Sequence, residues 1–477
     1  MSDHFIIFKK KMEYKSFVLT LLLLLVISST STIVASLKMK MHSMEKNEFL
    51  RKMPRKIIRQ DASPFISVLD YGAVADNATD CTAAFQAAIT AASRGKTKVV
   101  YAPSGLYVFK SSIQIPSGVT LQGSFSDVPS HSHSLTLNDG TILIPIGGRG
   151  DTDPSSYFIE LTGNAGLTGV VIYHKEQEQV ATPVPYPWSI MMHGNNPAVT
   201  DVEILNSWNG INATLAGRHY IARVQGQPIN IGIFIDATYD IGRVEDVHFN
   251  PWFSDAQPFI EYQLLYGRAF VIGRSDWEYV FNTFAFGYAV GYHFIHTSTG
   301  DMNGNFLGIG ADLMTNASVL VDASQAAGIL ITNGEFTAFS NSQWEPNLYK
   351  NLTHSSQVVV SKTNTGPVKF VNSAFWGPSS SIARIEGTGT ITFSDCQFVE
   401  WAEEPGDKDL SAINIMGGKI IATGNVFHQN KLAILMSDNV QQAIISNNLF
   451  AGNEETSLKI SPNKPKQIVV GSNSFAS

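Results

Sequence analysis

Residues 274–279, in the stretch "GRSDWEYVF", combine two carboxylates, a guanidinium and two aromatic rings. Glycoside hydrolysis usually needs two carboxyl groups, about 5–5.5 Å apart for retention and about 6.5–9.5 Å apart for inversion. Residues i and i+2 of a strand share one face and lie about 6.6–6.8 Å apart. Asp276 and Glu278 are therefore a candidate catalytic pair if this stretch is a strand, with Trp277 packed inward. The alternative is a structural ion pair between Arg274 and one of the two acids.

A second acidic cluster precedes this stretch, in "GIFIDATYDIGRVEDVHF". Asp236 ends an apolar run and Asp240 follows a turn, so both are candidate catalytic carboxylates beside Asp276. One of these acids would protonate the leaving oxygen, with a pKa raised by its acidic neighbours, and another would activate water.

Cationic and aromatic side chains supply the other half of a sugar site, because guanidinium groups hold acidic or hydroxyl-rich sugars and pyranose faces pack on rings. We expect substrate binding from five residues near the acids: Arg243, Arg274, Trp252, Trp277 and Tyr279. Two further acids, Asp312 and Glu335, follow later in the chain. No metal-ligand motif is evident, and this chemistry requires no cofactor.

The C-terminal part of the chain is an internal repeat. Six segments share about four mostly apolar residues, a turn-forming residue, two more residues and a phenylalanine: "ILITNGEF", "VKFVNSAF", "ITFSDCQF", "IIATGNVF", "AIISNNLF" and "IVVGSNSF". The phenylalanines are spaced by 39, 23, 29, 23 and 25 residues, and such a period indicates a stacked architecture. The apolar runs are short, β-branched and bounded by Asn, Gly, Ser and Asp, which is typical of strands.

Strands that repeat at this interval without helices between them predict an all-β chain, a parallel β-helix with its coils in residues 125–477. The phenylalanines would stack inside, and the Asn or Asp three residues earlier would adopt the backbone of a tight turn. Asp246 has this turn position before Phe249. A single helix is predicted between Asp80 and Gly95, where it would cover the open end of the sheets.

The opening of the folded part resembles the pectate-lyase superfamily, and most closely its polygalacturonase-related and rhamnogalacturonase/epimerase-like members. The resemblance is carried by "DYGA" at 70–73, "YAPSGLY" at 101–107 and "IPSGVTLQG" at 115–123, within an N-terminal segment and cap at 61–124. It implies a right-handed parallel β-helix, a single-stranded solenoid that acts on or binds acidic or neutral polysaccharides. It leaves a homotrimer open, because many proteins of this kind trimerise.

The catalytic signatures of the polygalacturonases are missing. These enzymes carry Asn-Thr-Asp, Asp-Asp, Gly-His-Gly and Arg-Ile-Lys on successive coils, and none of the four occurs in this sequence. No catalytic residue therefore carries over from the family. The paired acids favour a glycoside hydrolase, with a polysaccharide lyase or a non-catalytic polysaccharide-binding or adhesion protein as alternatives. Two outward carboxyls in a groove would indicate an enzyme, and a flat aromatic strip without them a binding protein.

The first sixty residues have the pattern of a targeting segment. Four lysines between residues 9 and 15 precede the apolar run "FVLTLLLLLVI" and then small residues, as in a secretory signal. Extended over residues 17–35, the apolar stretch is long enough for a membrane anchor. We expect a signal peptide or signal anchor at 1–36 and a basic stem at 37–60. The body would be secreted, or membrane-anchored and extracellular or lumenal.

The glycosylation sequons of the sequence agree with a secreted or membrane-anchored body. Four acceptor sequons predict glycosylation at Asn77, Asn212, Asn316 and Asn351. Cys81 and Cys396 are too few for a disulfide framework and are predicted to be buried apolar residues. Residues 1–60 hold 12 Lys+Arg and 4 Asp+Glu, which leaves 21 and 36 for the rest of the chain. An acidic body argues against a nucleic-acid partner.

Overall fold

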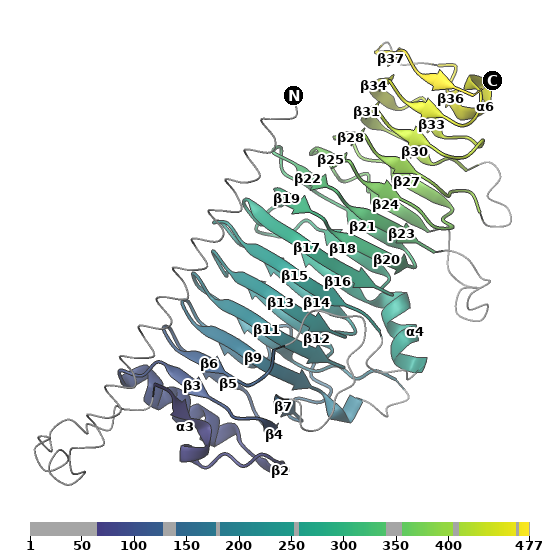
Figure 1. The fold of residues 1–477 in the computed structure, drawn as a ribbon. Helices are drawn as coiled ribbons and strands as arrows, with labels where there is room; N and C mark the ends of the chain where they lie inside the picture. Colours follow the sequence, from purple (N-terminus) through teal and green to yellow (C-terminus); the bar gives the residue numbers. More distant parts are fainter. Residues whose placement is uncertain are drawn as a thin grey trace, which may run out of the picture. The chain divides into compact units, whose positions relative to one another are not determined.

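The computed structural model describes residues 64–126, 140–177, 182–251, 257–339, 355–403, 410–463 and 467–476. Residues Phe65–Ser477 form one compact unit, in which the strands of successive coils lie side by side (Figure 1). The predicted signal or anchor and its basic stem lie outside the described residues. Among the residues that are described, no helix is long and apolar enough to cross a membrane.

One sheet, which we call the B sheet, contains 13 parallel strands that follow one another in sequence order. They are β5 (Ile113–Ile115), β8 (Tyr157–Leu161), β10 (Trp188–Met192), β12 (Asn209–Thr214), β14 (Ile231–Asp236), β16 (Arg268–Ile272), β18 (Val290–Phe294), β21 (Ala317–Val321), β24 (Ser356–Val360), β27 (Ser381–Ile385), β30 (Ile413–Ile415), β33 (Ile434–Met436) and β36 (Leu458–Ile460). Each coil contributes one strand, so the predicted all-β parallel β-helix is confirmed.

The other sheet, the A sheet, contains 25 strands. In the later coils the chain bends partway through its passage across this sheet, so each of these coils contributes two short strands. The strands before the fully bent coils are β1 (Ile66–Ser67), β2 (Asp76–Asp80), β3 (Val99–Tyr101), β4 (Gly105–Phe109), β6 (Thr120–Gln122), β7 (Thr141–Pro145), β9 (Gly166–Tyr173), β11 (Ala198–Leu205), β13 (Tyr220–Gly226), β15 (Arg243–Phe249) and β17 (Glu278–Phe286). The paired short strands are β19 (Gly304–Leu307) and β20 (Gly310–Met314), β22 (Ile329–Thr332) and β23 (Glu335–Ala338), β25 (Val368–Val371) and β26 (Ala374–Phe375), β28 (Thr390–Ser394) and β29 (Gln397–Phe398), β31 (Gly418–Thr423) and β32 (Val426–Phe427), β34 (Val440–Ser446) and β35 (Leu449–Phe450), and β37 (Ile468–Val470) and β38 (Ser474–Phe475).

The bend of the A sheet is made by residues with a left-handed backbone. Asn333, Asn372, Asp395 and Asn447 have φ angles of 56°, 49°, 58° and 59°. They are the turn residues of the sequence repeat, and Asn and Asp adopt this conformation at less cost than other side chains. Asp246 has a φ of 53°, which confirms its predicted place in a turn.

The recurring phenylalanines stack inside the β-helix, as the repeat predicts. The ring centroids of Phe398 and Phe427 lie 4.6 Å apart, those of Phe427 and Phe450 4.8 Å, and those of Phe450 and Phe475 4.9 Å. The rings are tilted from one another by 13°, 7° and 9°. One aromatic side chain per coil therefore forms a continuous column in the core.

The predicted front helix is α3 (Thr82–Arg94), which ends at Gly95 as expected. The helix covers the end of the first coils (Figure 1). On its buried face, Phe85 packs against Phe109, with 4.9 Å between the ring centroids. The N-cap is Cys81 rather than Asp80, although Asp80 Oδ1 still accepts the N–H of residue 82 at 3.0 Å.

A second long helix, α4 (Gln257–Tyr266), was not predicted. Its sequence "QPFIEYQLLY" spreads apolar residues around the helix, so it lacks the one-sided periodicity from which helices are inferred. Three shorter helical turns complete the described elements: η1 (Val68–Tyr71), η2 (Lys175–Gln177) and α6 (Glu454–Ser457).

The cysteines and two of the sequons lie as expected. Cys81 and Cys396 are free and fully buried. Asn77 and Asn316 are exposed, while Asn351 lies outside the described residues. Asn212 is only 7% exposed, and its Oδ1 accepts the Thr214 hydroxyl at 2.6 Å. Its predicted glycosylation is therefore incompatible with the folded chain, because the acceptor amide belongs to a packed strand.

We predict that Phe427→Ala destabilises the protein by about 3–5 kcal/mol, because it leaves a cavity between two stacked rings. The matched control is Leu449→Ala, since Leu449 is 50% exposed on the neighbouring coil and a surface change should cost less than about 0.5 kcal/mol. Urea unfolding of the three proteins measures both effects. Equal losses in the two variants would contradict the role of the column.

Candidate functional site

The turns that follow the B-sheet strands form one edge, the turn edge, because the strands end in register. Register pairs Val321 with Val360 and Val360 with Ile385. The next residues of the three coils are Asp322, Ser361 and Glu386, which therefore stand on one line, about 4.8 Å apart per coil. Polar side chains from distant parts of the sequence are thus neighbours at this edge.

The prediction that Asp276 and Glu278 share an outward face is wrong. Trp277 is 60% exposed and has a φ of 67°, whereas Glu278 is fully buried. The left-handed residue reverses the chain, and β17 begins only at Glu278. Strand alternation therefore does not apply to these three residues, and the candidate pair does not exist as such.

Glu278 forms a buried ion pair with His219. His219 Nε2 lies 3.0 Å from Glu278 Oε1, and Ser275 Oγ donates to Glu278 Oε2 at 2.6 Å. Burial lowers the pKa of His219, but the charge and the hydrogen bond of the Glu278 carboxylate outweigh burial and raise it above its ordinary value. Both side chains are closed off from solvent. Glu278 is therefore a structural group that cannot reach a substrate.

Asp276 forms the structural ion pair that was the alternative prediction. Arg274 Nη2 donates to Asp276 Oδ2 at 2.7 Å. On the other side, Gln325 Nε2 donates to Asp276 Oδ1 and to the carbonyl oxygen of Asp301, each at 2.7 Å. Asp301 Oδ1 lies 2.7 Å from His296 Nδ1. One glutamine thus connects Asp276 with the next acid along the turn edge.

The other two predicted catalytic acids also have structural partners. Asp236 Oδ1 accepts the main-chain N–H of Arg274 at 2.8 Å and the hydroxyls of Thr297 and Thr299 at 2.9 and 2.8 Å. It holds the turns of neighbouring coils together. Asp240 is exposed and lies 3.2 Å from Arg218. The four predicted acids therefore do not converge on one pocket.

Further along the turn edge lies a groove of about 870 Å³, the turn-edge groove. Three carboxylates line it, from Asp301, Asp322 and Glu386, together with the cationic or titratable side chains of Lys362 and His296. The sequence signal was weak, because each acid is a single polar residue beyond an apolar run, as in "VLVD" and "ARIE". Only the register of the coils brings them together.

The carboxylate of Asp322 has the most defined surroundings in the groove. His293 Nε2 lies 2.8 Å from its Oδ2, and Ser361 Oγ donates to its Oδ1 at 2.5 Å. The hydrogen bond with His293, followed by that of Ser361, holds the pKa of Asp322 below its ordinary value. Glu386 Oε1 lies 3.1 Å from Arg384 Nε. Asp322 therefore stays ionised at neutral pH.

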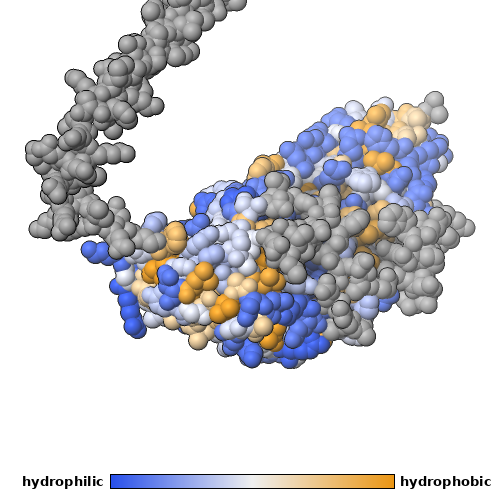
Figure 2. Space-filling model, turned by 60° about the horizontal axis from the view of Figure 1, so that its bottom comes forward, coloured by the Kyte–Doolittle hydropathy of each residue, from blue (hydrophilic) through white to orange (hydrophobic). Residues whose placement is uncertain are grey.

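Two of the five predicted substrate-binding residues, Arg243 and Tyr279, lie elsewhere, on the exposed face of the A sheet. Register places Arg243 beside Tyr279 and Phe281 beside Leu307. Three large apolar side chains are exposed here and form the aromatic strip: Tyr279, Phe281 and Leu307, at 42%, 48% and 42%. Trp277, which is 60% exposed, lies in the turn before β17. Arg274 is instead engaged by Asp276, and Trp252 lies outside the described residues. Exposed hydrophobic groups also interrupt the hydrophilic surface elsewhere (Figure 2).

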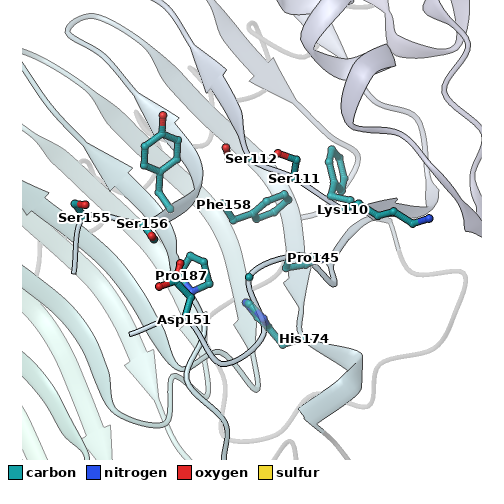
Figure 3. A pocket seen from close by; sticks show the side chains of 14 residues that line it. Lys110, Ser111, Ser112, Pro145, Asp151, Ser155, Ser156, Phe158, His174 and Pro187 are labelled. Carbon is teal, nitrogen blue, oxygen red and sulfur yellow. The ribbon is translucent and has the colours of Figure 1, made fainter. Parts of the chain in front are cut away.

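A pocket of about 410 Å³ among the first coils offers different chemistry (Figure 3). Lys110, Asp151, Phe158 and His174 are among its lining residues. Burial lowers the pKa of His174 to about 3, so its imidazole is neutral. Asp151 is the one carboxylate among the described lining residues, and no predicted site residue is among them. Within the described part of the chain, no three His, Cys, Asp and Glu side chains converge as metal ligands.

Comparison with known proteins finds a family match for the N-terminal segment. Residues 65–143 match the family described as "Rhamnogalacturonase A/epimerase, pectate lyase-like", which overlaps the motifs that carried the resemblance. This segment is therefore similar to a pectate-lyase-like family, and the chain as a whole has the parallel β-helix fold. No curated protein matches its sequence at a significant level.

Solved structures share the fold of this β-helix protein over most of its length. The A-module of the mannuronan C-5 epimerase AlgE6 of Azotobacter vinelandii is 12% identical, with a TM-score of 0.50, and the match covers 86% of this chain and 100% of that one. The DFA-IIIase of Arthrobacter chlorophenolicus A6 in complex with GF2 is 13% identical, with a TM-score of 0.54, and the match covers 83% and 96%. Identities this low show the fold alone.

We predict that His219→Gln destabilises the β-helix protein more at about pH 5.5 than at about pH 8.5. The folded pKa of His219 is raised above an unfolded value of about 6.5. Its contribution is therefore complete below that value and is lost as the pH rises through the folded pKa. Thermal unfolding of both proteins across this range measures the effect. A Tm difference that widens toward pH 8.5 would mean that the pair is not charged as described.

Proposed function

We propose that the protein is a polysaccharide-acting enzyme of glycoside hydrolase type, with its active site in the turn-edge groove. One observation carries the proposal: the carboxylates of Asp301, Asp322 and Glu386 line a single groove of about 870 Å³. The match to the rhamnogalacturonase A/epimerase family supports a polysaccharide as the substrate. Lys362 and His296 in the same groove suit an acidic or hydroxyl-rich sugar.

The roles follow from the spacing of the coils. Asp322 and Glu386 lie two coils apart on one line, about 9.6 Å at Cα, with Ser361 between them. Inverting enzymes hold their two carboxyl groups about 6.5–9.5 Å apart, which leaves room for the attacking water, and backbone positions two coils apart suit such a pair. Ionised Asp322 takes a proton from that water as its oxygen bonds to the anomeric carbon.

Glu386 is the acid that protonates the departing oxygen as the glycosidic bond breaks. Its side chain is 30% exposed in the free protein, so solvent and Arg384 surround the carboxyl before substrate binds. Asp322 thus takes one proton from the attacking water, and Glu386 gives one proton to the leaving sugar.

A non-catalytic polysaccharide-binding function has one observation in its favour, the aromatic strip. Flat rows of exposed rings bind sugar chains without cleaving them, and the rings of Tyr279 and Phe281 are exposed at alternate positions of one strand. The two functions are compatible, because the strip lies on strands β17 and β19, whereas the groove is lined by the turns that follow β18, β21, β24 and β27.

The location of the body is inferred from the N-terminal sequence alone. We propose that residues 1–36 direct it out of the cytoplasm, either as a cleaved signal or as an anchor through residues 17–35. N-terminal sequencing of the mature protein from secreting cells distinguishes the two. Protein in the medium whose N-terminus lies near residue 37 indicates cleavage of a signal. Protein in the membrane fraction with an intact N-terminus indicates the anchor. A full-length chain in the cytosolic fraction would contradict both.

We predict that Asp322→Asn and Glu386→Gln each lower kcat at least about 100-fold, the usual contribution of an acid or base. A panel of plant, algal and microbial polysaccharides is screened for new reducing ends with the wild-type protein, and the variants are assayed on the substrate found. Asp438→Asn is the matched control, because Asp438 lies at the same edge two coils beyond Glu386. Its turnover should be unchanged.

Three outcomes would overturn this assignment. Normal turnover by both variants would remove the groove as the active site. Unsaturated products would show a lyase instead of a hydrolase. Binding without turnover on any glycan, abolished by Phe281→Ala, would leave the aromatic strip as the functional surface.

A further inference from the structure

A notch interrupts the A sheet where glycine replaces the outward side chain at two positions of one coil. Register places Gly308 between Asn282 and Asn333 on the line of the bend. It also places Gly310 between Phe284 and Glu335 on the adjacent line, where the ring of Phe284 covers the glycine. A side chain is thus absent at two neighbouring positions of one coil, and the space above Gly308 stays open. We call this gap the glycine notch.

The notch is a pocket of about 280 Å³ with aromatic and polar walls. Phe284 is on one side, and Glu335 with Trp376 is on the other. The Trp376 ring is 39% exposed, and its Nε1 donates to Glu335 Oε1 at 3.0 Å, which fixes the indole. Asp312 Oδ1 accepts the hydroxyl of Thr337 at 2.6 Å. The two later acids of the sequence, Asp312 and Glu335, therefore meet here.

The amides beside the notch are oriented by their outer neighbours. Asn372 Nδ2 donates to Asn333 Oδ1 at 2.8 Å, and Asn282 Nδ2 donates to Asp246 Oδ1 at 2.7 Å. Each amide thus turns its bonded atom away from Gly308. The Asn333 nitrogen and the Asn282 oxygen remain for a ligand in the gap, which gives one donor and one acceptor.

This combination favours a neutral sugar. Exposed rings pack against the C–H face of a pyranose, while carboxylates and amides bond its hydroxyls. No Lys, Arg or His is among the described residues that line the notch, so nothing there compensates the charge of a uronate or a sulfate. The volume is at the small end of ligand pockets, which suits one sugar unit.

We propose that the glycine notch binds one neutral sugar unit of a polysaccharide, at a site separate from the turn-edge groove. The inference rests on the proposed polysaccharide ligand but not on its hydrolysis. Neutral units occur as branches and chain ends, so the notch would hold a substrate by a part that is not cleaved. Substitutions that fill or remove the notch should weaken polysaccharide binding and leave the carboxylates of the turn-edge groove in place.

The test uses Gly308→Asn and Trp376→Ala in the full-length protein. Gly308 has a φ of 62° and nothing within 4 Å of an added Cβ, and its neighbours on the same line are already Asn. The substitution therefore fills the notch with a residue that this backbone accepts. Calorimetry with neutral gluco-, galacto- and xylo-oligosaccharides should show at least a 10-fold weaker Kd for both variants than for the wild type. Leu449→Ala, a change of an exposed side chain on a later coil of the same sheet, should bind as the wild type does.

The controls separate the two sites. Binding of neutral oligosaccharides that is lost in the two notch variants but kept in Leu449→Ala supports the notch even if the groove proves not to be catalytic. Melting temperatures close to that of the wild type confirm folding, and Trp376→Ala still tests the site if Gly308→Asn does not fold. The proposal is overturned if no neutral oligosaccharide binds, if both variants bind normally, if acidic oligosaccharides bind the notch equally well, or if Ca²⁺ alone occupies it.

Discussion

The structure depends on the strict register between successive coils. Each coil repeats the backbone of the one before it, and the phenylalanine column fixes that repeat from the inside, with centroids 4.6–4.9 Å apart from Phe398 to Phe475. Because a shift of one residue would turn every inward side chain outward, the register cannot slip. Residues at equivalent positions therefore form straight lines along the molecule, and every site described is a set of neighbours on such lines.

The same rule gives each line a different use. The bend line of the A sheet holds residues that adopt a left-handed backbone, such as Asn333 and Asn372, and it is structural. The positions directly after the B-sheet strands do not require a left-handed backbone. They can therefore hold different residues, here Asp322, Ser361 and Glu386. Where the bend line lacks a side chain, at Gly308, it opens a pocket. The proposed functional sites thus lie at positions where the repeat does not restrict the residue type, or where a side chain of the repeat is absent.

The fold could be predicted from the sequence because the repeat is a local pattern, visible as a turn residue three positions before each phenylalanine. The site could not. Asp276 and Glu278 look like alternating strand residues, but Trp277 is left-handed, and Glu278 turns inward to His219. The acids of the groove carry no motif, since each is one polar residue at a strand end. Their proximity depends on loop lengths between coils, which a local pattern does not contain.

The central claim is that polysaccharide binds in the turn-edge groove between Asp322 and Glu386. A crystal structure of the Glu386→Gln protein soaked with an oligosaccharide of its substrate tests this most directly. The account predicts sugar density in the groove, with a water beside the carboxylate of Asp322 and the glycosidic oxygen beside residue 386. Density confined to the aromatic strip, with an empty groove, would contradict it.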